Sequence, residues 1–159
     1  MEQYPENYSR QLEHLLALVN DGKEGFKKAS EIVSTQELKE KLLAYSEQRA
    51  QMADEFREQI MKLGGEARNR EGDKAGMVHR AIMYFKTAFT KADKDDQAVL
   101  ETCRTGDQAA LDAFDDVLQG SILETNLKPF LVHQRYLISM ALYDIEKLYF
   151  DRFKTKPEV

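Results

Sequence analysis

The feature that most restricts the fold of this chain is a spacing of three and four residues between apolar or small positions, sustained over long segments. From Tyr8 to Val33 this spacing continues without a break, and from Leu127 to Leu148 only Gln134 interrupts it, as expected for one packed face of an α-helix. Proline interrupts helices, yet the chain has only three prolines, and two of them lie near its ends. The pattern therefore predicts long helices, and no segment alternates in the way of a β-strand.

Local signals indicate where these helices begin and end. The run Ser34-Thr35-Gln36-Glu37 matches a capping box, in which a hydroxyl group caps the first turn of a new helix. Gly64-Gly65 suits a left-handed helix ending, and Pro129 falls in a first turn, where proline is tolerated. We expect long helices at about 8–33, 35–63, 96–119 and 127–153, and a shorter connecting helix at about 74–89.

Chain length and helix order predict one domain. A chain of 159 residues can form a single core, and a helix at 74–89 is long enough to cross the length of a bundle. The expected fold is all-α: a single ferritin-like four-helix-bundle domain over residues 1–159, with a short helical crossover between the second and third long helices.

Several phrases spread over nearly the full length resemble an uncharacterised bacterial family of ferritin-like four-helix-bundle domains, known only as a domain of unknown function. The resemblance implies the bundle fold with a helical crossover and implies no activity. The phrases that carry it are Leu15–Val33, Gln48-Arg49, Glu55-Phe56, Leu63-Gly64-Gly65-Glu66, Gly76–Ala81, Thr105–Ala110 and Gln134-Arg135.

Composition argues against several classes of partner. The 28 acidic and 23 basic residues give a net charge of -5, which is the wrong sign for general binding to nucleic acid or to a membrane surface. No apolar run is long enough to span a bilayer, the start of the chain has no secretory signal pattern, and a single cysteine forms no internal disulfide. We therefore expect a cytoplasmic protein without nucleic-acid or membrane partners.

A ferritin-like fold raises the question of a di-iron centre, which typically uses Glu-x-x-His pairs on two helices. None of the three histidines fits, because the residues three positions before His14, His79 and His133 are Gln11, Gly76 and Phe130. Asp21 falls off the stripe of the first helix. We expect no metal and no cofactor. A carboxylate-only metal site remains an alternative, with Glu24, Glu47, Glu55, Glu101 and Asp107 as candidate ligands.

Two charged residues interrupt otherwise apolar stripes near the middle of their helices. Arg49 does so in the second long helix and Asp107 in the third. Because an unpaired buried charge is strongly unfavourable, we expect them to pair, with Gln134 and Gln59 completing a core polar network. Such a network fixes helix register. The alternative is a polar cavity beside Arg49 and Gly22 that binds an anion or a small molecule.

The remaining candidates are weaker. His79 and Arg80 are candidates for a surface or partner site, and Cys103 lies on an apolar stripe, which favours a core role. Aromatic residues near the end of the last helix, such as Tyr143 and Phe150, exceed what one stripe needs, so they either cover the core or form a homo-oligomer contact.

No catalytic residue emerges from the sequence. We expect a non-catalytic bundle that acts through its helix surfaces as a structural or interaction module. The alternatives are a metal-binding carboxylate bundle, with oxidoreductase or metal-storage chemistry, and a small-molecule or anion binder near Arg49.

Overall fold

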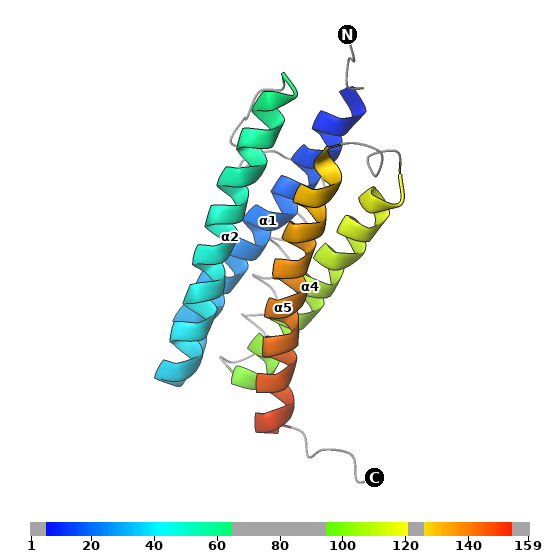
Figure 1. The fold of residues 1–159 in the computed structure, drawn as a ribbon. Helices are drawn as coiled ribbons and strands as arrows, with labels where there is room; N and C mark the ends of the chain where they lie inside the picture. Colours follow the sequence, from blue (N-terminus) through cyan, green and yellow to red (C-terminus); the bar gives the residue numbers. More distant parts are fainter. Residues whose placement is uncertain (1–5, 65–94, 121–125, 154–159) are drawn as a thin grey trace.

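The computed structural model describes residues 6–64, 95–120 and 126–153, which form four α-helices and no strand. The helices are α1 (Glu6–Ile32), α2 (Gln36–Lys62), α4 (Asp96–Leu118) and α5 (Leu127–Phe153), and they lie side by side as a bundle (Figure 1). These bounds lie within two residues of those expected from the apolar spacing. The expected connecting helix at 74–89 lies outside the described residues.

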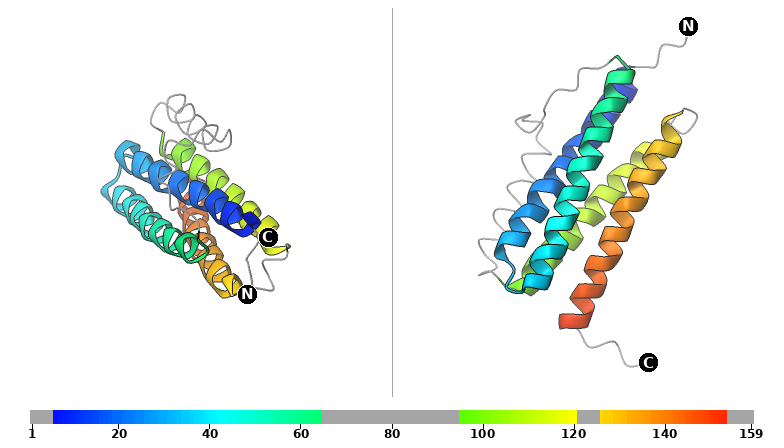
Figure 2. Two further views of the ribbon diagram at one scale, coloured as in Figure 1. Left: turned by 90° about the horizontal axis from the view of Figure 1, so that it is seen from above. Right: turned by 60° about the vertical axis from the view of Figure 1, so that its left-hand side comes forward.

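Helix direction follows from the contact between Ser34 and Asp96. The Ser34 amide, in the turn between α1 and α2, donates to Asp96 Oδ1 at 2.9 Å, so α4 begins beside that turn. From there α4 runs antiparallel to α1, and α5 returns antiparallel to α4 (Figures 1 and 2). As a result α2 and α4 run in the same direction, unlike in a bundle with simple up-and-down connections.

The start of α2 differs from the expected capping box by one residue. Thr35, not Ser34, is the N-cap, and its hydroxyl accepts a hydrogen bond from the Leu38 amide at 3.2 Å. Ser34 instead contacts Asp96 on another helix, which the local sequence does not reveal. At the other end of α2, Gly64 adopts a φ of +81°, the left-handed ending expected for this glycine pair.

The core has two apolar clusters, one toward each end of the bundle. In the first, Phe56 is fully buried between the rings of Phe114 and Phe130, at centroid distances of 6.0 and 4.9 Å. The second includes Leu42, Leu100 and Tyr149. On both α2 and α4 a gap near the middle of the helix separates the residues of the two clusters. Each gap contains a buried charged residue, Arg49 on α2 and Asp107 on α4. None of the described helices has the length and apolar character needed to cross a membrane.

Candidate functional site

Arg49 and Asp107 meet in the interior between the two apolar clusters. Arg49 Nη2 donates to Asp107 Oδ2 at 3.0 Å, and Arg49 Nη1 lies 2.9 Å from Asp107 Oδ1. Their side chains are only 1% and 3% exposed. This two-point contact, which we call the Arg49–Asp107 pair, joins α2 to α4 and matches the planar guanidinium to both carboxylate oxygens.

Helix α1 provides the space for this guanidinium. A Cβ atom added at Gly22 would lie 2.7 Å from Arg49 Nη1, closer than a side chain allows. The guanidinium carbon also lies 5.0 Å from the centroid of the Phe26 ring, within the range of a cation–π contact. A small residue at position 22 and an aromatic ring at position 26 therefore shape the site around Arg49.

Two opposing effects act on the pKa of Asp107 in this pair. Burial raises the pKa of Asp107 above its ordinary value, and the charge and hydrogen bonds of Arg49 offset part of this rise. Protonating Asp107 would leave a buried guanidinium without a counterion, and we therefore expect the carboxylate form. Burial also raises the pKa of the neighbouring Cys103 thiol well above its ordinary value, which keeps this residue neutral and unreactive.

The two glutamines expected in the network have different surroundings in the structure. Gln134 donates to Glu55 Oε2 at 2.6 Å, and its own Oε1 is buried with no hydrogen-bond partner among residues 6–64, 95–120 and 126–153. Gln59 is only half-buried, because after Phe56 the buried face of α2 continues to Ile60 rather than to position 59. Among the residues that the structure describes, no hydrogen bond links either glutamine to the Arg49–Asp107 pair.

Asp21 is buried, contrary to the expectation that it lies off the inner face of α1. It is 6% exposed, and its Oδ2 has no hydrogen-bond partner within the described part of the chain. Burial raises its pKa from the ordinary value of 3.8 to about 7. The physical reason is that α1 packs against both α2 and α4, so its buried sector is wider than one stripe of residues.

A cavity of about 580 Å³ opens along α1 and α4 and reaches the Arg49–Asp107 pair, and Asp21 also lines it. Its volume falls within the range of small-molecule sites in proteins. No cluster of three His, Cys, Asp or Glu side chains suited to a metal ion occurs among the described residues. The cavity is therefore lined mostly by apolar side chains, together with several carboxylates and one described arginine that already has a counterion.

The burial of Asp21 predicts a pH-dependent stability. Between pH 3.8 and about 7 the folded carboxyl binds a proton more readily than the unfolded one, so its contribution to stability falls as pH rises through this window. Asp21→Asn removes the ionisation, and we expect it to raise the melting temperature by about 3–6 °C near pH 8 and less near pH 5. Thermal melts at both pH values test this. An equal shift at both would contradict it.

Other site candidates have different outcomes. Cys103 is buried in the core as expected, and His79 and Arg80 lie outside the described residues.

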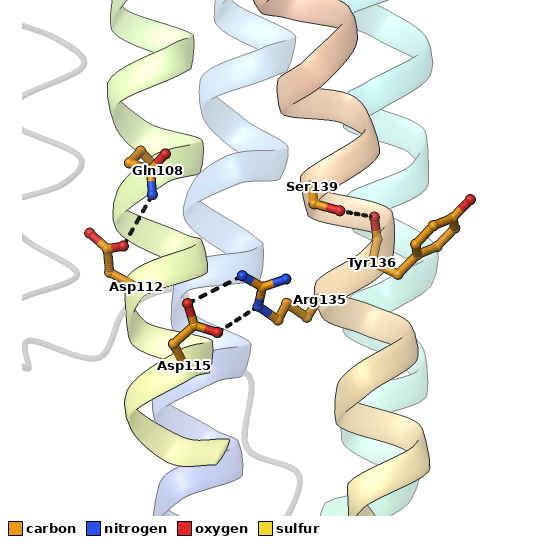
Figure 3. A network of polar contacts seen from close by, with 6 residues as sticks. All are labelled: Gln108, Asp112, Asp115, Arg135, Tyr136 and Ser139. Carbon is orange, nitrogen blue, oxygen red and sulfur yellow. Dashed lines mark hydrogen bonds and ion pairs between the residues drawn. The ribbon is translucent and has the colours of Figure 1, made fainter. Parts of the chain in front are cut away.

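A surface ion pair that sequence reasoning missed joins Arg135 of α5 to Asp115 of α4, with Nε to Oδ1 at 2.6 Å and Nη2 to Oδ2 at 3.2 Å (Figure 3). The sequence carries no local signal for this link, because the two residues are on different helices.

Comparison with known families gives one match. The family described as Domain of unknown function (DUF2383) matches residues 7–120, which include α1, α2, α4 and the Arg49–Asp107 pair. No curated protein and no solved structure matches the chain.

Proposed function

The chain belongs to the family Domain of unknown function (DUF2383), and we propose from its surfaces that it is a ferritin-like, non-catalytic interaction module. Its proposed partner is a second copy of the same chain, bound through the outer face of α5. The observation that carries this proposal is a row of exposed apolar side chains along that helix.

The course of the helices supports the ferritin-like assignment. In an up-and-down bundle each helix runs opposite to the one before it, whereas α2 and α4 run in the same direction (Figure 1). A long connection between the second and third long helices is the arrangement that ferritin-like folds use.

Helix α5 has a second apolar face directed away from the core. Tyr136 and Tyr143 are 56% and 62% exposed, and Val132, Met140 and Phe150 are also exposed. Successive spacings of four, four, three and seven residues place these five side chains, which we call the α5 outer stripe, on one side of the helix. Figure 3 shows the Tyr136 side chain directed away from α4.

The length of the α5 outer stripe suits a helix–helix contact. It extends over about 27 Å at 1.5 Å per residue. Its three aromatic residues, which are 38–62% exposed, alone present roughly 300 Å² of surface, which matches the lower end of the range for the largest apolar patch of a typical monomer. Pairing two such stripes would form the apolar centre of a small homodimer interface.

Charge favours an antiparallel arrangement of the two α5 helices. Met140 and Tyr143 stand at the middle of the stripe, and Lys147 lies on the same side. In a parallel pair the Lys147 side chains of the two copies would face each other, and their like charges would repel. In an antiparallel pair centred between Met140 and Tyr143, Lys147 faces the Tyr136 ring of the other copy, where a cation–π contact is favourable. This two-fold arrangement is the commonest homodimer symmetry.

The interior chemistry supports a non-catalytic role. Arg49 is neutralised by Asp107, and burial holds the Cys103 thiol in its neutral form. A reactive cysteine or a free guanidinium in the core would favour catalysis or anion binding, and these two groups offer neither. The proposed activity therefore lies at the surface of the bundle.

Tyr143→Glu tests this proposal by sedimentation equilibrium. We expect the wild-type chain to be a dimer at concentrations of about 100 μM, and the variant to dissociate at least about tenfold more readily, because the dimer would bury a carboxylate at its apolar centre.

Met61→Glu is the matched control. Met61 is as exposed as Tyr143, at 63%, and it lies on α2 near the end of the helix rather than on the α5 outer stripe. We expect it to leave the association unchanged. A monomeric wild-type chain at this concentration, or equal weakening by both variants, would contradict the proposal.

A further inference from the structure

We infer that the cavity between α1 and α4 binds an organic cation, an ammonium group on a hydrocarbon body, with the Asp21 carboxylate as its charge partner. This site lies on α1, α2 and α4, so it does not depend on self-association through α5.

The first reason is the state of Asp21. A buried carboxyl normally has hydrogen-bond partners, because leaving a buried polar group without a partner lowers stability. Asp21 is more than nine-tenths buried, lines the cavity, and has an Oδ2 atom without a partner in the described residues. A donor bound in the cavity would satisfy this oxygen and make a charge-assisted hydrogen bond.

The second reason is the sign of the charge around the cavity. The exposed carboxylates of Asp112 and Asp116 also line it. Arg49 is the only Lys or Arg among its described lining residues, and both terminal nitrogens of Arg49 contact Asp107. His14 is the remaining titratable group with a cationic form. Among the described lining residues, carboxylates therefore exceed cations, and this balance favours a bound positive charge over an anion.

The third reason is the apolar part of the wall. Leu18 and Phe26 of α1 and Ala110, Ala113 and Val117 of α4 line the same cavity. Contact with a hydrated inorganic ion contributes little binding free energy at such a surface, whereas burial of a hydrocarbon group there is favourable. The absence of a three-ligand cluster among the described residues agrees with an ammonium ligand rather than a metal ion.

Calorimetric titration with three probes of equal chain length tests the inference. Hexylammonium, hexanol and hexanoate share the same hydrocarbon body and differ in charge. On the full chain near pH 8, where Asp21 is largely ionised, we expect hexylammonium to bind at least about tenfold more tightly than hexanol, and hexanoate to bind most weakly.

Asp21→Asn keeps the size of the side chain and removes its charge. We expect it to lower the affinity for hexylammonium at least about tenfold and to leave hexanol binding unchanged. The matched control is Asp151→Asn, which removes an exposed carboxylate from α5, outside the cavity, and should leave all three affinities unchanged. Circular dichroism checks that both variants keep their helix content.

The inference is wrong if hexylammonium does not bind to the wild-type chain, if hexanoate binds as tightly, or if Asp21→Asn leaves hexylammonium binding intact. Tyr143→Glu separates this test from that of the proposed function. It should dissociate the dimer and retain hexylammonium binding, so one proposal can fail while the other holds.

Discussion

Replacing Arg49 with methionine is expected to lower the free energy of unfolding by about 3–5 kcal/mol. The variant leaves Asp107 in the interior without a counterion, since this carboxyl is 3% exposed and both of its oxygens contact Arg49. Because methionine fills much of the volume of arginine, the lost free energy of unfolding comes mainly from the unpaired carboxyl of Asp107 and only slightly from a new cavity. Denaturant unfolding followed by circular dichroism gives the value.

The double variant Arg49→Met/Asp107→Leu separates the two contributions. Apolar residues of similar volume often replace a buried ion pair with no loss of stability, so we expect the second substitution to restore most of the free energy. The control is Arg57→Met, which breaks the exposed pair with Asp54 at 2.9 Å and should change stability by less than about 1 kcal/mol. Unchanged stability in Arg49→Met would contradict a requirement of Asp107 for its partner.

Apolar spacing, together with local signals at the helix ends, was enough to predict the helices that the structure describes. Because a helix buries one face, the spacing of its apolar residues predicts which side of the helix faces the core. The structure buries the residues that this spacing selects, for example Leu12, Val19, Leu42 and Phe114. Arg49 and Asp107 could be singled out for the same reason, because each interrupts a stripe that is otherwise apolar. The structure places these two side chains in direct contact.

Other features depend on how the helices pack against one another, and the apolar spacing of a single helix does not predict them. Asp21 is buried because α1 packs against both α2 and α4. A prediction that assigns one apolar stripe to each helix allows for only one of these two neighbours. Gln134 lies on the inner stripe of α5, but its contact with Glu55 depends on which residues of α2 face it, and that requires the helix order and axial offset. The cavity also depends on the distance between two helices, which periodicity does not encode.

Gly22→Ala is expected to lower the free energy of unfolding by about 2–3 kcal/mol, although alanine is the better helix former. The new Cβ atom would lie 2.7 Å from Arg49 Nη1. The end of an arginine side chain ordinarily moves aside at little cost. Here the guanidinium is held by both oxygens of Asp107, so any shift lengthens these contacts in the interior. Denaturant unfolding measures the loss.

The sign of this effect should reverse when the pair is absent. In the Arg49→Met/Asp107→Leu background the guanidinium no longer occupies the space beside position 22, and the unbranched methionine side chain can adjust to a new methyl group. There we expect Gly22→Ala to stabilise the chain by up to about 1 kcal/mol, the difference in helix propensity between the two residues. An equal loss in both backgrounds would mean that the glycine serves helix packing in general, whereas opposite signs would assign its role to the fit of Arg49 against α1.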